Sequence, residues 1–258
     1  MQVLTPSLDY TEFIARIAKA PARLLLLDYD GTLAPFRVKP EEARPYPEVL
    51  PVLREIMRRR ATRVVIVSGR PAGELPPLLA LEERPEIWGS HGWERLAPDG
   101  ATEVQQPTPD ERCALEAAEH AAAAAVACGA RMERKLASIA LHWRGLSGDA
   151  AQACRDAATG AWSGLTGAGT LALLEFDGGL ELRAPGCNKQ HAVKAVLALT
   201  PSDAAIAYLG DDLTDEDAFR GVRARGVSVL VRNEFRPTAA DLWLKPPEEL
   251  VAFLRHWR

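Results

Sequence analysis

The sequence lacks basic tracts, long apolar runs and paired cysteine motifs, and each absence removes a class of protein. Its 258 residues carry a formal net charge of -4, and the densest basic cluster, Arg58–Arg60, closes a predicted helix whose C-terminus favours positive charge. A nucleic-acid partner is therefore not expected. No uninterrupted apolar stretch is long enough to span a bilayer, and residues 1–13 lack the pattern of a secretory signal.

The four cysteines are scattered and form no CxxC pair, which argues against a disulfide framework and against a zinc site. Free thiols are typical of a reducing compartment. We therefore expect a cytoplasmic protein without a membrane partner, present as a monomer or a small homo-oligomer.

Apolar runs alternate with helical periodicity in the first and last parts of the chain. Arg23–Asp28 and Arg63–Ser68 are nearly continuous apolar runs, typical of strands buried on both faces of a parallel sheet. The C-terminal part repeats the pattern, with a helix expected to begin at Thr214 as its N-cap. Strands that alternate with helices predict an α/β fold with helices on both faces of the sheet. The other expected elements are helices at about 10–18, 48–60, 188–199 and 247–257, one after Pro71, and strands at 205–209 and 227–231.

The middle of the chain, roughly Arg95 to Pro185, has a different pattern. An alanine-rich helix is expected that includes residues 116–128 and ends at Gly129, followed by strands at Met132–Arg144 and Thr170–Phe176. A glycine pair then predicts a hairpin into Leu180–Arg183. This part is interpreted as a separate α+β module inserted into the first domain.

Asp28 and Asp30 stand directly after a buried strand, and Gly31 follows them. Glycine permits a sharp turn that brings the second carboxylate back over the site of the first. One carboxylate can attack phosphorus and form an acyl-phosphate. The other can donate a proton to the leaving oxygen and then accept one from water. The simpler interpretation is an Asp-Gly turn at a strand end.

Three further segments follow strands or open helices, where parallel α/β sheets place their ligands. Ser68-Gly69-Arg70 offers a hydroxyl and backbone N–H groups to phosphate oxygens, and Lys189 can neutralise charge on a transferring phosphoryl group. The acid cluster Asp211, Asp212 and Asp215 needs a counter-ion, and Mg²⁺ prefers such oxygen ligands. Taken singly, each segment has an ordinary alternative: a strand-end loop, a solvated lysine or an acid-rich helix start.

In this order the four segments resemble the motifs of the haloacid dehalogenase (HAD) superfamily of phosphotransferases. Its DxDGTL motif matches residues 28–33, and its GDDxxD motif matches residues 210–215. The resemblance implies a Rossmann-like, doubly wound parallel-sheet core at 1–94 and 185–258, with an inserted α+β cap of the C2 type at 95–184. Such caps close over small substrates and supply specificity.

The resemblance also implies roles for single residues. Asp28 would be the nucleophile and Asp30 the general acid/base, while Ser68 and Lys189 would bind the phosphoryl group. The residues that would hold or support Mg²⁺ are Asp28, Asp30 through its backbone carbonyl, Asp211, Asp212 and Asp215.

Within the superfamily, the chain resembles trehalose-6-phosphate phosphatases in LDYDGTLAPF, VSGR and GSHGWE, the last at residues 89–94. Their cap pattern ExKxxSxxxHxR matches residues 133–144, and residues 181–183 are similar to their second cap segment. Two positions depart from the family: Asp177 stands in place of a common cap lysine, and Gln190 in place of the usual glycine. The residues that would bind the sugar are Glu133, Lys135, Arg144 and Glu181.

The implied activity is magnesium-dependent hydrolysis of trehalose 6-phosphate to trehalose and phosphate through an aspartyl-phosphate, a hydrolase reaction of trehalose biosynthesis. The alternatives are a phosphatase for mannosylglycerate, glucosylglycerol or sucrose phosphate, a sugar-phosphate mutase, and a non-catalytic sugar-phosphate sensor.

The predicted cap strand contains a conflict. Alternate residues from Ala137 to Trp143 are apolar and would face the cap helices. Glu133 and Lys135 have that same parity, so they would have to lie before the strand or past a bulge to bind a sugar.

Overall fold

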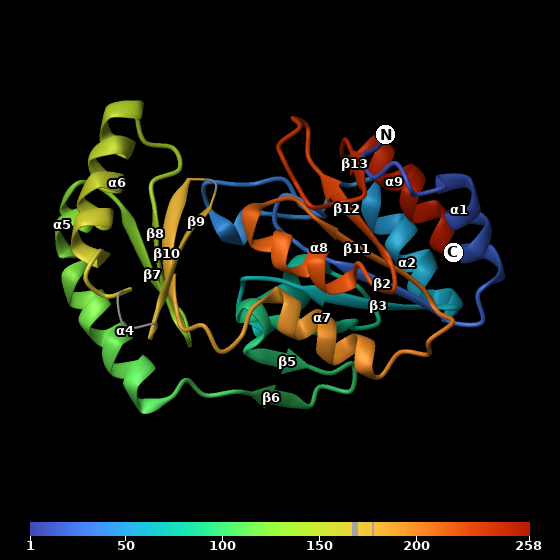
Figure 1. Ribbon diagram of the computed structural model, residues 1–258, viewed down its shortest axis with the longest axis horizontal. Helices are drawn as coiled ribbons and strands as arrows, with labels where there is room; N and C mark the ends of the chain where they lie inside the picture. The colour runs from blue at the N-terminus through green and yellow to red at the C-terminus, as the bar shows by residue number, and fades with distance from the viewer. Residues whose placement is uncertain (167–169, 177) are drawn as a thin grey trace. The chain divides into compact units, whose positions relative to one another are not determined.

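The computed structural model describes residues 1–166, 170–176 and 178–258, and the chain forms two compact units. The first unit comprises Met1–Glu103 and Asn188–Arg258, and the second comprises Val104–Cys187. Each unit has its own sheet and its own helices (Figure 1).

The first unit is built on a nine-stranded sheet. Its strands are β1 (Gln2–Val3), β2 (Arg23–Leu27), β3 (Thr62–Val67), β4 (Glu86–Gly89), β5 (Glu94–Leu96), β6 (Thr102–Val104), β11 (Ala205–Gly210), β12 (Val227–Val231) and β13 (Leu242–Leu244). The order across the sheet is β1-β13-β12-β11-β2-β3-β4-β5-β6. The strands from β13 to β4 run parallel, and β1 and β5 join them antiparallel. The predicted α/β fold with a parallel sheet is confirmed.

Helices cover both faces of this sheet, which explains its apolar strands. Leu25 and Leu27 of β2 lie in one buried cluster, while Leu24 and Leu26 lie in another on the opposite face. Because successive side chains of a strand point to opposite faces, a strand covered twice must be apolar at every position. The first cluster contains residues of α1 (Tyr10–Lys19), α2 (Val49–Arg59), α3 (Leu75–Leu79) and α9 (Glu248–Leu254), and the second contains residues of α7 (Lys189–Ala198) and α8 (Glu216–Val222).

The second unit pairs a four-stranded antiparallel sheet with helices. The sheet has the order β7 (Arg131–Arg134), β8 (Ser138–His142), β10 (Gly179–Arg183) and β9 (Ala172–Phe176). The helices are α4 (Pro109–Ala121), α5 (Ala123–Ala127) and α6 (Gly148–Trp162). The α4 and α6 helices contact β8 or β10, and the Trp162 indole N–H donates to the Ala118 carbonyl at 3.0 Å. The predicted hairpin of β9 and β10 is confirmed.

The single strand predicted over Met132–Arg144 is wrong. The segment is a hairpin of β7 and β8, closed by a bond from the Lys135 N–H to the Ser138 carbonyl at 2.9 Å. Glu133 pairs with Ala140, and Ala140 also pairs with Glu181 on β10. Paired residues of an antiparallel sheet share a face, so the two glutamates lie on the same face and the parity conflict disappears.

Helix boundaries differ from the sequence predictions at two places. Thr214 is not an N-cap, because the Asp212 side chain accepts from Leu213 N–H and caps the 3-10 turn Leu213–Asp215 that precedes α8. The alanine-rich helix begins at Pro109 behind a Thr108 capping box and breaks at Ala122.

Three remaining features of the chain bear on the sequence predictions. All four cysteines are thiols. Within the described residues, no helix is both long and apolar enough to cross a bilayer. Asp177, predicted to replace a cap lysine, lies outside the described residues.

Candidate active site

Three adjacent parallel strands bring the chemistry-bearing segments to one edge of the first sheet. The β2 strand lies between β11 and β3, and all three end at the same edge. Asp28 follows β2, Ser68 follows β3 and Asp211 follows β11. The Asp28 N–H donates to the Leu209 carbonyl at 2.9 Å, so the sheet bonding continues up to the candidate nucleophile.

The loop after β2 folds tightly under Asp211. Gly31 has a φ of 85° and donates its N–H to the Ala34 carbonyl at 2.7 Å. A Cβ at this position would lie 2.1 Å from the Asp211 carboxylate, so glycine is required both by the left-handed backbone and by the close approach. Thr32 donates its hydroxyl to Asp28 Oδ2 at 3.0 Å.

Lys189 joins the C-terminal half of the unit to this loop. It is the first residue of α7, which Asn188 caps by accepting from the His191 N–H at 2.9 Å. The Lys189 Nζ lies 2.7 Å from Asp28 Oδ1 and 2.7 Å from Asp215 Oδ1, and its side chain is only 3% exposed. A buried ammonium held by two carboxylates is fixed in position and in charge.

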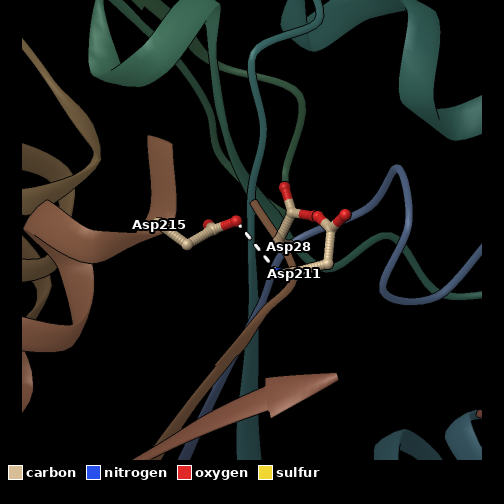
Figure 2. Close-up of side chains that lie close together, drawn as sticks. All are labelled: Asp28, Asp211 and Asp215. Atoms are coloured by element: carbon tan, nitrogen blue, oxygen red, sulfur yellow. Dashed lines mark hydrogen bonds between the residues drawn. The ribbon is translucent and has the colours of Figure 1, made fainter. Parts of the chain in front are cut away.

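Asp215 organises the acidic segment. Its Oδ1 accepts from the Tyr208 hydroxyl at 2.6 Å as well as from Lys189. Its Oδ2 accepts from the N–H groups of Asp211 and Asp212, each at 3.1 Å, and Figure 2 shows the first of these bonds. Both oxygens of this carboxylate are therefore occupied by donors of the protein.

Burial and the close approach of charged groups shift the pKa values of Asp28, Lys189 and Asp211. Burial, together with the nearby Asp215, raises the pKa of Asp28 to about 7 against the lowering effect of Lys189. Burial, with Asp28 and Asp215 nearby, raises the pKa of Asp211 well above its ordinary value. Burial alone would lower the pKa of Lys189, but Asp215 and Asp28 together raise it. Three buried carboxyl groups therefore share one ammonium.

The donor set fits a hard divalent cation. Carboxylate oxygens of Asp28, Asp211 and Asp215 lie within 4.8 Å of one another, and all three residues are buried (Figure 2). Of the other predicted residues, Asp212 caps a turn with its side chain, and the Asp30 side chain bonds Arg70, which leaves the predicted role of the Asp30 backbone carbonyl untouched. Asp28 and Asp211 have the oxygen chemistry that Mg²⁺ prefers.

The segment after β3 lies beside Asp30. The Arg70 guanidinium donates to both Asp30 oxygens, at 2.6 and 2.7 Å, and the Arg70 N–H donates to Ser68 Oγ at 3.2 Å. Ser68 is 1% exposed. The arginine predicted to bind phosphate thus holds the carboxylate predicted to act as acid and base.

Sequence reasoning missed the roles of Tyr208 and Glu94. Glu94 accepts from the Ser90 hydroxyl at 2.6 Å and from the Ala72 N–H at 2.8 Å, and thereby ties two loops at the same edge of the sheet. The sequence feature that could have identified Tyr208 is a hydroxyl-bearing residue inside an apolar, buried strand. Glu94 had the signal of a carboxylate in a segment otherwise rich in glycine.

In the second unit, the predicted sugar-binding residues form a cluster on one face of the sheet. Glu181 Oε1 accepts from Ser138 at 2.6 Å and from Lys135 at 3.4 Å. Glu133 lies 2.9 Å from His142 Nε2 and 3.9 Å from Lys135 Nζ. The neighbouring His142 lowers the pKa of Glu133 to about 2, with a further lowering by Lys135.

The fourth predicted sugar-binding residue, Arg144, lies beside Gly178. It follows the C-terminal end of β8, and a Cβ on Gly178 would lie 3.0 Å from the Cβ of Arg144. It is therefore at the turn of the β9–β10 hairpin.

Comparisons with known proteins agree with this geometry. A trehalose-phosphate phosphatase of Mycobacterium marinum is 31% identical over 251 residues, which cover 90% of this chain and 60% of that protein. The chain thus spans less than two thirds of this curated relative. The C-terminal domain of Candida albicans trehalose-6-phosphate phosphatase has the same fold, with a TM-score of 0.85 at 20% identity over 100% of this chain and 99% of that one.

The fold also extends to the wider superfamily. A haloacid dehalogenase-like hydrolase of Bacillus subtilis aligns with a TM-score of 0.64 at 15% identity, over 91% of this chain and 99% of that one. The trehalose-phosphatase family model matches residues 26–246, which is most of the sequence. The chain therefore belongs to the trehalose-phosphatase family, within the haloacid dehalogenase fold.

Proposed function

We propose that this chain is a magnesium-dependent phosphatase that hydrolyses trehalose 6-phosphate to trehalose and phosphate. The observation that carries the proposal is the Lys189 ammonium, buried 2.7 Å from both Asp28 and Asp215 and beside Asp211. A structural ion pair needs two partners. Three buried carboxylates around one lysine leave negative charge that a cation must balance.

The reaction would run through an acyl-phosphate on Asp28. A carboxylate oxygen of Asp28 attacks phosphorus, and the bond from phosphorus to the sugar oxygen breaks. Asp30, released from the Arg70 guanidinium and protonated, would donate its proton to that leaving oxygen. Asp30 then takes a proton from water, whose oxygen attacks phosphorus and returns Asp28 as a carboxylate. Lys189 and the segment beginning at Ser68 hold the phosphoryl oxygens throughout.

Mg²⁺ would be held by Asp28, Asp211 and the backbone carbonyl of Asp30, and it would supply positive charge to the phosphoryl oxygens. Asp215, whose oxygens already accept from Tyr208, Lys189 and two backbone N–H groups, would act by fixing these ligands. Asp212 would support the same loop through its cap.

We propose the first unit as the catalytic core and the second as a cap that selects the substrate. The support is the polar face of the second sheet, where Glu133, Lys135 and Glu181 lie together. Carboxylates and an ammonium are suited to the hydroxyl groups of a sugar. Arg144, which follows β8, is proposed as a further contact on the family pattern alone.

Phosphate release tests the proposal. We expect the wild type to release phosphate from trehalose 6-phosphate with Mg²⁺ and to stop when EDTA removes it. Asp28→Asn should lose at least about a thousandfold in kcat. Asp203→Asn is the matched control, because Asp203 is an exposed aspartate outside the site, and it should keep full activity. Full activity of Asp28→Asn would refute the mechanism.

The substrate is tested separately with a panel of sugar phosphates: trehalose, sucrose, mannosylglycerate and glucosylglycerol phosphates. The highest kcat/KM should fall on trehalose 6-phosphate, and free phosphate rather than an isomerised sugar phosphate should be the product. Since all four cysteines are thiols, we also propose a reducing, cytoplasmic location. Size-exclusion chromatography with light scattering would test the expected monomer or small homo-oligomer.

A further inference from the structure

A strained turn follows β4 at the same edge of the sheet. Ser90, His91 and Gly92 have successive φ values of 49°, 58° and 103°, so three residues in a row are left-handed. Among the described residues, the other non-glycine residues with such φ values are Arg60 and Ala80, and each of these ends a helix. Helix ends commonly carry a left-handed residue, but consecutive left-handed residues with side chains are unfavourable.

Bonds from several directions hold this turn. The Ser90 hydroxyl donates to Glu94 at 2.6 Å, and Glu94 also accepts from the Ala72 N–H. The Ser90 N–H donates to the Arg70 carbonyl at 2.7 Å, and the His91 N–H donates to the Ser68 carbonyl at 3.0 Å. Strained backbone persists only where the surroundings over-determine it, and it gathers at functional sites.

The turn contacts two of the segments that would hold phosphate. A Cβ added to Gly69 would lie 2.7 Å from both Cε1 and Nε2 of His91, so the imidazole fills the space that any other residue at 69 would need. On its other side, a Cβ on Gly92 would lie 3.0 Å from the Asn188 carbonyl, at the start of the helix that carries Lys189. His91 itself is 7% exposed.

We propose that His91 is a positioning residue for phosphoryl transfer: its ring, held in place by the strained turn, fixes the backbone of the Ser68–Arg70 segment that receives the phosphoryl oxygens. This inference rests on the proposed phosphatase function. With the ring in place, the Gly69 backbone cannot move toward His91, and the N–H groups after β3 keep one direction. Preorganised N–H donors are worth most when they need no rearrangement during the reaction.

Releasing the strain while removing the ring separates positioning from folding. His91→Gly deletes the imidazole and suits a φ of 58°, so Tm should stay or rise by about 2 °C. We expect kcat to fall by about 10- to 100-fold with KM within about threefold, and the inhibition constant of orthovanadate to rise with the loss in kcat. If His91 served only stability, His91→Gly would lower Tm and leave kcat unchanged.

Two further variants keep the test decisive. Ala80→Gly relieves a left-handed residue at a helix end remote from the site and should leave kcat unchanged. His91→Asn removes the ring but tolerates a left-handed backbone, and it should lose kcat as His91→Gly does. The proposal is overturned if His91→Gly and His91→Asn both keep kcat within about twofold of wild type.

Failure of the proposed function would look different. A wild type that releases no phosphate from any sugar phosphate would refute that function. The positioning role of His91 would then be tested by measuring the rise in Tm that orthovanadate causes in the full chain with Mg²⁺. Loss of this rise in His91→Gly supports the inference, and an unchanged rise overturns it.

Discussion

Replacing Gly31 by alanine should damage the site through a single methyl group. The new Cβ would lie 2.1 Å from Asp211 Oδ2 and 2.3 Å from its Cγ. Ordinary van der Waals contact begins at 3.4 Å, so the Asp211 carboxylate or the loop has to move by about 1.3 Å. The φ of 85° adds a backbone cost of about 1–2 kcal/mol for a residue that carries a Cβ.

The displacement of Asp211 predicts a loss of activity, and the backbone cost at position 31 predicts a loss of stability. A displacement of about 1 Å in a catalytic group costs on the order of a hundredfold in rate. Because Asp211 is a proposed magnesium ligand, the Mg²⁺ concentration for half-maximal activity should also rise. The backbone term should lower Tm by roughly 2–4 °C per kcal/mol in a chain of this size.

Gly73→Ala is the matched control for this prediction. No atom lies within 4 Å of the position that a Cβ on Gly73 would take, so the same substitution adds a methyl group without a clash. Steady-state kinetics across a magnesium titration, with thermal melts of both variants, measure the effect. A Gly31→Ala enzyme with wild-type kcat and wild-type magnesium dependence would refute the contact between this loop and Asp211.

Three other predictions follow from the described contacts. Tyr208→Phe removes one donor to Asp215 and should lower kcat by about tenfold with little change in KM, as steady-state kinetics would show. Burial would raise the pKa of Glu86, but Arg63 and Arg95 lower it. Glu86 therefore adds stability above pH ~4.5, and this stability is lost as the pH falls through the pKa of the folded state. Glu86→Gln should accordingly flatten the acid side of the profile of Tm against pH. Since Asp28 has a pKa of about 7 and must lose its proton to bind a cation, half-maximal activity should need more Mg²⁺ at pH 6 than at pH 8. An activation constant that is flat with pH would contradict this last expectation.

Buried strands were the part of the fold that the sequence predicted best. The apolar runs at Arg23–Asp28 and Val227–Val231 correspond to β2 and β12 within one residue, because a strand covered on both faces has no polar position to obscure it. The long helix α6 (Gly148–Trp162) was missed. Alanine occurs at exposed, half-buried and buried positions of this helix and marks no face, so its periodicity is weak even though Trp162 is fully buried.

The cap hairpin shows where periodicity alone fails. Alternation from Ala137 to Trp143 correctly separates the face of β8 that contacts helices from the polar face. The turn at Lys135–Ala137 carries no glycine, proline or asparagine, so nothing local marked the end of β7. Placing Glu133 and Glu181 on one face of the sheet required the register of three strands, which is a long-range property.

The site itself was predicted as residue types but not as contacts. The motifs around Asp28, Lys189 and Asp211 identify the groups, since parallel strands end at one edge. The bidentate bond of Arg70 to Asp30 and the four donors on Asp215 depend on side-chain directions that spacing does not contain. These contacts decide which carboxylates are available and which are already satisfied.

Asp28 and Lys189 are 161 residues apart in the chain, and the strand that leads to Asp28 pairs with β11, which is translated after the whole second unit. During synthesis β2 can pair with β3 early but gains its second neighbour late, while the hairpins and helices of Val104–Cys187 have their partners close in sequence. An N-terminal fragment that ends before β11 keeps β2 to β6 but lacks the strands β11, β12 and β13 on the other side of β2, and it also lacks Asp211 and Asp215. Catalytic turnover therefore requires that the C-terminal strands β11, β12 and β13 have folded onto β2. A folding defect in any of these strands should abolish activity even when the earlier part of the chain is folded.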